Sequence, residues 1–172
     1  MNKLRRIVTG HDANGRSRIA IDGPPLADDG PLLEVWSAPP GPLDSRGRSD
    51  QAAGPVQLCP PAGGSKFRYF TIAPIPDGVP VEALESLFAD RFAEFGASHC
   101  RVDTRHHPSM HKTETLDYII LLRGEVTMLL DEDEVALRPG DVVVQRGTNH
   151  GWVCTGPEPA LLCAILIDAE VT

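Results

Sequence analysis

Alternation of apolar and polar residues is strongest in the second half of the chain. From His111 to Leu121 the odd-numbered residues share one strand face, which runs His, Thr, Thr, Asp, Ile and Leu. Such a face is typical of a pocket wall that is polar at the mouth and apolar at the floor. Strands are predicted at 116–122, 125–130, 135–137, 142–145, 150–154 and 161–167. Short strands at such regular intervals predict an antiparallel barrel or sandwich.

The first half of the chain predicts a hairpin, isolated strands and a long loop. Residues 4–22 form the expected hairpin, with Asn-Gly, a strong turn signal, between its two strands. Further strands are expected at 32–37 and 66–73. Residues 38–65 are rich in Pro, Gly, Ser, Asp and Arg and bury little apolar surface, which predicts a long, partly mobile loop. A lid over the pocket is the functional alternative for this loop.

One amphipathic helix is predicted over residues 80–95. Pro80 suits a first helical position, and Gly96 ends the helix. Its apolar residues fall on one stripe, which we interpret as core rather than as part of a binding site; they are Leu84, Leu87, Phe88, Phe92 and Phe95.

Composition and charge narrow the possible partners. The chain has 172 residues, enough for one domain with a core, and a formal charge of -8, which argues against nucleic acid or an anionic membrane as partner. No apolar run has the length of a membrane span and no signal region follows the first residues, so a cytoplasmic protein is expected. The four cysteines show no C-x-x-C spacing, so we expect small buried thiols rather than a zinc site or a disulfide framework.

Two histidines and one aspartate are the candidate catalytic and metal-binding residues. We expect His111, Asp117 and His150 to meet around one metal ion, because two imidazoles and one carboxylate are the donor set of non-haem Fe(II) oxygenases. His107 is a possible extra ligand, with a solvated loop histidine as the alternative. If no metal binds, His111 and Asp117 are expected to hydrogen-bond to one another, because buried polar groups need partners.

Four further residues are candidates for substrate binding. Arg68 interrupts an apolar strand face and can bind a carboxylate with two hydrogen bonds, although an exposed arginine at a sheet edge is the alternative. The other three flank His150, and they are Gln145, Arg146 and Trp152. The alternatives are a turn arginine that faces water and a core tryptophan.

Residues 106–154 resemble the cupin superfamily, whose two motifs lie on a double-stranded β-helix. In the first motif Gly124 matches the closing glycine, Asp117 stands in place of the family's Glu, and His111 takes the first His position. Thr113 stands where the second His is found. His150 matches the His of the second motif. The whole chain looks like single-domain cupin 2 proteins of bacteria and fungi, which are mostly uncharacterised.

The resemblance implies an all-β fold and a metal. The expected fold is a cupin-like jelly roll with an N-terminal hairpin extension and one short covering helix. We expect a single cupin domain over 1–172, divided into a hairpin and strand (1–37), a loop (38–65), a strand and helix (66–100) and the motif-bearing barrel (101–172). Cupin enzymes hold Fe(II), Mn, Ni or Zn with three His and a Glu. Cupins also commonly pair through sheet edges, so a homodimer is expected.

Three functions are compatible with these residues. The first is a mononuclear metal-binding cupin that acts on a small oxygenated or carboxylated organic molecule, by oxygenase or Lewis-acid chemistry. The second is a metal-free isomerase or dehydratase that uses His111 and Asp117 as an acid–base pair. The third is a barrel that binds a small molecule without catalysis.

Overall fold

Strands dominate the computed structural model, which describes residues 4–27, 30–47 and 49–172. Most elements begin and end within two residues of their expected bounds. The short strand β3 was not expected. In chain order the elements are β1 (Arg6–His11), β2 (Ser17–Gly23), β3 (Leu26–Ala27), β4 (Leu32–Ala38), β5 (Ser65–Ile72), α1 (Val81–Glu94), the 3-10 helix η1 (Ser98–Cys100), β6 (Thr115–Arg123), β7 (Val126–Leu129), β8 (Glu134–Leu137), β9 (Val142–Arg146), β10 (Gly151–Cys154) and β11 (Ala160–Asp168).

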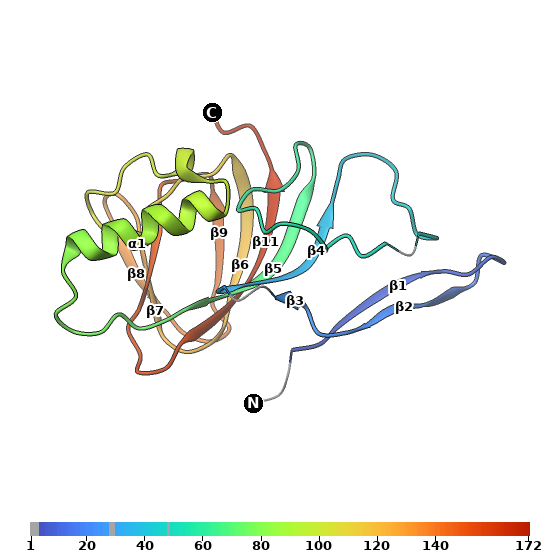
Figure 1. The fold of residues 1–172 in the computed structure, drawn as a ribbon, viewed down its shortest axis with the longest axis horizontal. Coiled ribbons are helices and arrows are strands. Elements are labelled where there is room, and N and C mark those ends of the chain that lie inside the picture. Colours follow the sequence, from blue (N-terminus) through green and yellow to red (C-terminus); the bar gives the residue numbers. More distant parts are fainter. Residues whose placement is uncertain (1–3, 28–29, 48) are drawn as a thin grey trace.

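Antiparallel pairing arranges these strands into two main sheets and a separate hairpin. The larger sheet has the order β3-β4-β5-β11-β6-β9, and the smaller has the order β10-β7-β8. Strands β1 and β2 pair only with each other and extend away from the barrel (Figure 1). The predicted all-β jelly roll with an N-terminal hairpin extension and one helix is confirmed.

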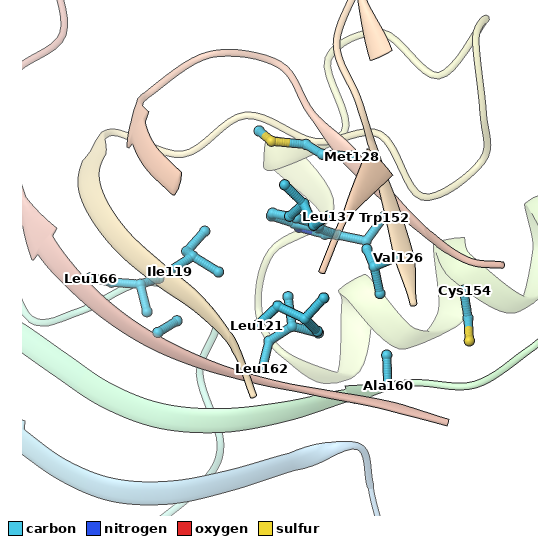
Figure 2. Close-up of a cluster of buried hydrophobic side chains, with 11 residues drawn as sticks. Ile119, Leu121, Val126, Met128, Leu137, Trp152, Cys154, Ala160, Leu162 and Leu166 are labelled. Atoms are coloured by element: carbon cyan, nitrogen blue, oxygen red, sulfur yellow. The ribbon is translucent and has the colours of Figure 1, made fainter. Parts of the chain in front are cut away.

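The apolar core lies between the two main sheets (Figure 2). On β6 the odd-numbered side chains from Thr115 to Leu121 are buried, whereas Tyr118 and Leu122 are exposed, as the alternation predicts. Leu121 and Leu162 are fully buried, and they face the smaller sheet. The other core residues come from β6, β7, β8, β10 and β11, and they are Ile119, Val126, Met128, Leu137, Trp152, Cys154, Ala160, Ala164 and Leu166.

Gly124 makes the turn from the larger sheet to the smaller one possible. Its φ is 87°, a conformation that L side chains rarely adopt. A Cβ atom at this position would lie 2.7 Å from the Cα of Ala160 on β11. The closing glycine of the first motif is therefore required by close backbone packing.

Helix α1 lies against the barrel rather than within the core (Figure 1). Pro80 is its N-cap, one position before the first helical residue, whereas the first helical position itself was expected. Gly96, with φ 65°, follows the end of the helix, as expected. The interpretation of the apolar stripe as core is confirmed in part, because Phe92 belongs to a small apolar cluster against which Phe88 and Phe95 pack. All five residues of the stripe also line a cavity, and only Phe92 among them is buried. No helix in the described parts of the chain has the length and hydrophobicity that crossing a membrane requires.

The segment between β4 and β5 has neither helix nor strand in its described residues, 39–47 and 49–64. It is nevertheless fixed at several points. The guanidinium of Arg6 forms an ion pair with Asp50 and donates to the carbonyl oxygen of Val35 at 2.8 Å. The amide of Leu58 donates to the carbonyl oxygen of Phe95 at 3.0 Å, and Leu58 lines the cavity. The loop thus forms part of the cavity wall.

Candidate active site

A cavity of about 410 Å³ opens between the larger sheet, strand β10 and helix α1. Its volume is in the range of sites that bind drug-sized molecules. Most of its wall is apolar, with side chains from β5, the segment that follows β5, and α1. The polar residues among those that line it are Arg68, Thr71, Arg91, Ser109, His111, Asp117 and His150.

His111 and His150 lie side by side because their backbones form an isolated antiparallel bridge. The amide of each donates to the carbonyl oxygen of the other, at 2.8 and 2.9 Å. The ring centroids are 4.3 Å apart. Nδ1 of His111 donates to the carbonyl oxygen of Ser109 at 3.0 Å, which leaves Nε2 as the acceptor. Nδ1 of His150 lies 2.8 Å from the side-chain Nε2 of Gln145 and 3.0 Å from the carbonyl oxygen of Thr148.

Asp117 lies on β6, with its carboxyl group buried and facing the same cavity. Its Oδ1 has no hydrogen-bond partner among the described residues. Burial raises the pKa of Asp117 to about 6, against smaller opposing effects of Thr115 and the positive charge of Arg68. The hydroxyls of Thr113 and Thr115 lie 2.7 Å apart, so Thr113 forms a polar contact within the strand face where the cupin motif has a second His.

Arg68 also lines the cavity, and its side chain is only 2% exposed. Its Nη2 lies 2.7 Å from Glu34 and donates to the carbonyl oxygen of Gln57 at 2.6 Å. Nε and Nη1 have no partner among the described residues. The alternative of an exposed edge arginine was wrong, because β4 and β11 pair with β5 on either side. The pairing of Arg68 with Glu34 was not predicted. A sequence signal for it exists, because each of these charged residues interrupts an otherwise apolar strand.

The other candidate residues have different surroundings. Trp152 both packs in the core and lines the cavity. Gln145 is buried and its side chain forms a hydrogen bond with His150, but it does not line the cavity. Arg146 is exposed outside the cavity, because it is adjacent to Gln145 on β9 and therefore faces the other side of the sheet. His107 also lies outside it, with Nδ1 2.7 Å from the hydroxyl of Ser109 and its ring beside Phe88. Gln145 and Arg146 therefore do not line this cavity, and a role for them in substrate binding stays a prediction.

The proposed ligand atoms for one metal converge only in part. His111 and His150 are neighbours, and with the unpartnered Oδ1 of Asp117 they provide the right donor types. In the described residues, however, this trio is not a group of ligand atoms within 4.8 Å of one another, whereas Cys59, His99 and Cys100 are such a group. The shorter side chain of aspartate, relative to glutamate, limits its reach into the cavity. Metal binding by the trio stays a prediction.

Burial of the two histidines has a consequence for stability in acid. Burial lowers the pKa of His111 to about 4 and, together with the neighbouring His111, that of His150 to about 3. The unfolded chain therefore takes up protons below pH 6.5 that the folded chain does not, so stability is lost as the pH falls. Asp117, with its raised pKa, has the opposite effect between pH 7 and pH 5.

We therefore expect the unfolding free energy of chelator-treated protein to fall by about 2 kcal/mol between pH 7 and pH 5. Urea denaturation at the two pH values measures this change. Most of the decrease should be absent in His150→Gln. If this variant loses as much stability as the wild-type chain, the two buried imidazoles are not the cause.

Comparisons with known proteins agree with the fold. The family described as "Cupin domain" matches residues 99–167. Phomopsin biosynthesis cluster protein C' of Diaporthe leptostromiformis is 54% identical over 44 residues, which cover 25% of this chain and 23% of that protein. Cupin-domain-containing oxidoreductase fogC of Aspergillus ruber is 36% identical over 65 residues, which cover 36% of this chain and 32% of that protein. The matches thus span about a quarter to a third of these curated relatives.

The crystal structure of a Cupin 2 conserved barrel domain protein from Salinispora arenicola covers 61% of this chain and 64% of its own, at 16% identity and a TM-score of 0.38. The matched segment, 99–167, begins in η1 and ends in β11, so it contains His111, Asp117 and His150. The antiparallel jelly roll and the family match together confirm the resemblance seen in the sequence. Residues 99–167 are a cupin domain.

Proposed function

We propose that this cupin binds a small, mostly apolar organic molecule with one oxygen function in the cavity and moves a proton on it with Asp117. The observation that carries the proposal is a pair of buried polar groups that line one apolar cavity and have atoms without a hydrogen-bond partner in the described parts of the chain. They are Oδ1 of Asp117, and Nε and Nη1 of Arg68. Unsatisfied buried polar atoms are costly in a fold, and a ligand that supplies their partners relieves this cost.

The substrate class follows from the walls and the polar groups. The wall is built largely from aromatic and aliphatic side chains, so most of the ligand is apolar. The free N–H groups of Arg68 can only donate, so they select an oxygen acceptor such as a carbonyl. Asp117 faces the same space and can accept a proton from a carbon next to that carbonyl.

The chemical step then needs only groups of this chain. At neutral pH Asp117 is mostly ionised, and its raised pKa makes it a stronger base than an ordinary carboxylate. It takes a proton from the carbon atom, and the electron pair moves onto the carbonyl oxygen, where the positive charge of Arg68 stabilises it. Return of the proton at another carbon gives an isomer, and loss of a neighbouring hydroxide as water gives a dehydrated product. His111 and His150 are neutral at this pH and border the reacting groups.

A second candidate function is supported by the same donor atoms and by the oxidoreductase names of relatives such as fogC. In it His111, Asp117 and His150 hold one divalent metal, Fe(II), Mn, Ni or Zn. Such an ion supplies Lewis-acid or, if it is iron, redox chemistry when bound. The spacing of the three ligand atoms favours the first function.

Proton exchange in D₂O distinguishes the two functions. Protein treated with chelator and dialysed is incubated with a panel of small aromatic and cyclic ketones, and NMR follows the loss of the hydrogen next to the carbonyl. Exchange that persists without metal is expected. Exchange that disappears on chelation and returns with one divalent ion, but not in His150→Ala, contradicts the metal-free proposal and supports the second function. Binding of the panel without any exchange would leave a non-catalytic binding barrel.

A further inference from the structure

Two thiols and an imidazole gather outside the barrel cavity, at the place where the long loop meets the end of α1. We call Cys59, His99 and Cys100 the loop cluster. Their ligand atoms all lie within 4.8 Å of one another. The two Sγ atoms are 3.9 Å apart, and Sγ of Cys100 is 3.5 Å from Nε2 of His99. No sequence motif indicates this cluster, because its two cysteines are 41 positions apart and form no C-x-x-C motif.

Backbone hydrogen bonds hold the loop cluster from three directions. The amide of Leu58, next to Cys59, donates to the carbonyl oxygen of Phe95 at 3.0 Å. The amide of Cys100 donates to Ala97 at 2.9 Å within η1. The carbonyl oxygen of Cys100 accepts from the amide of Lys112 at 2.8 Å, which joins η1 to the segment that carries His111. The positions of the two thiols therefore follow from the fold.

Two of the three distances within the loop cluster match the edges of a tetrahedral zinc site, and the third, between Cys59 and His99, is at most 4.8 Å. With Zn–S of about 2.3 Å and Zn–N of about 2.0–2.1 Å, the edges of a regular tetrahedron are about 3.8 Å between two sulfurs and about 3.6 Å between sulfur and nitrogen. The observed 3.9 and 3.5 Å differ from these edges by about 0.1 Å. A disulfide would instead require the sulfurs to approach to about 2.05 Å, with movement of the loop.

Charge and access also suit a thiophilic cation. The contact with Cys100 lowers the pKa of the Cys59 thiol to about 6, and the nearby Arg68 and Lys66 lower it further, whereas the same contact raises the pKa of Cys100. Cys59 is thus the thiol that ionises first, and the ion has to displace the proton of Cys100. Cys59 and His99 line a second cavity of about 390 Å³, and His99 is exposed. An ion can therefore reach the cluster from solvent, and water can occupy the fourth position.

We propose that Cys59, His99 and Cys100 bind one Zn(II) ion, which fixes the loop to the end of α1. Cys59 and Cys100 pack with Leu58, Phe92 and Phe95, and these three also line the barrel cavity. The ion therefore stabilises the positions of side chains that form one wall of the candidate active site. This proposal does not depend on the function proposed for that site.

Zinc titration of the reduced protein tests the proposal. Chelator-treated wild-type chain, kept reduced with a phosphine, is titrated with Zn(II), and bound metal is counted after gel filtration. Co(II) serves as a second probe, because thiolate ligation gives a charge-transfer band. We expect one Zn(II) per chain, no such site in Cys59→Ser or Cys100→Ser, and at least roughly tenfold weaker binding in His99→Ala. Since His99 is exposed, His99→Ala tests the site without disturbing the core.

Two variants serve as matched controls. Cys154→Ser changes a buried thiol outside the cluster, which donates to backbone carbonyl oxygens of Gly156 and Glu158, so a hydroxyl can replace it. His150→Ala removes the imidazole of the candidate active site. Both are expected to bind Zn(II) as the wild type does. Stoichiometry below one in the reduced wild-type chain, or zinc binding that survives both Cys59→Ser and His99→Ala, would overturn the proposal. Zinc binding that only His150→Ala abolishes would overturn it too.

Discussion

Arg68→Met is expected to lower the unfolding free energy by about 3–5 kcal/mol. Arg68 and Glu34 form a buried ion pair on adjacent strands, with side chains 2% and 7% exposed. Removing the guanidinium takes the nearest cation away from the buried carboxylate of Glu34, and the Lys66 ammonium lies farther off, at 4.0 Å. Because Lys66 compensates in part, the lower end of the range is expected. Urea or guanidinium denaturation at pH 7 measures the change.

Two further variants separate the buried charge from lost packing. The double variant Arg68→Met/Glu34→Gln removes both charges, and we expect it to recover much of the loss. Arg5→Met breaks the exposed pair with Asp22, which has a similar N–O distance of 2.6 Å, and is expected to change stability little. If the double variant is as unstable as Arg68→Met, packing of the arginine side chain rather than the buried carboxylate explains the loss.

The architecture was predictable because each element has a local signal. Alternation along β6 placed Thr115, Asp117, Ile119 and Leu121 on the buried face, and the glycines placed the turns. The helix was equally clear, but its role was not. An apolar stripe shows only that a helix face avoids water, and it does not show whether that face meets packed side chains or an apolar cavity. In α1 the stripe does both, because all five residues line the cavity while Phe92, with Phe88 and Phe95 beside it, also belongs to a small apolar cluster.

Site residues could be predicted where a sequence motif and the alternation of faces along a strand indicate the same position. They could not be predicted where a contact joins segments that are distant in the sequence. His111, Asp117 and His150 line one cavity because β6 and the bridge between the histidines bring them there. Arg146 does not line this cavity, because closeness in sequence to His150 does not decide which side of the sheet a residue of β9 faces. The pairing of Arg68 with Glu34, and of Cys59 with Cys100, depends on the path of the 39–64 segment, whose composition carries no register information.

Asp117→Asn is expected to abolish most of the proton exchange while making the fold more stable at neutral pH. The amide cannot act as a base, so the exchange rate should fall roughly 10²–10⁴-fold. In the wild-type chain the rate should rise with pH through about 6, as the carboxyl group ionises. A raised pKa in the fold means that stability is highest when the carboxyl is protonated and is lost as the pH rises through this value. The neutral amide avoids this loss.

The two effects of Asp117→Asn distinguish a base from a merely structural residue. At pH 8 the variant should exceed the wild-type chain in unfolding free energy by up to about 2–3 kcal/mol, and at pH 4 the gain should shrink, because the folded wild-type carboxyl is then protonated. Asp117→Glu keeps a carboxylate and restores the residue type of the cupin motif, so it should retain part of the exchange. If Asp117→Asn loses stability at pH 8 and its exchange rate falls no further than that of Asp117→Glu, Asp117 holds the strand together and another group moves the proton.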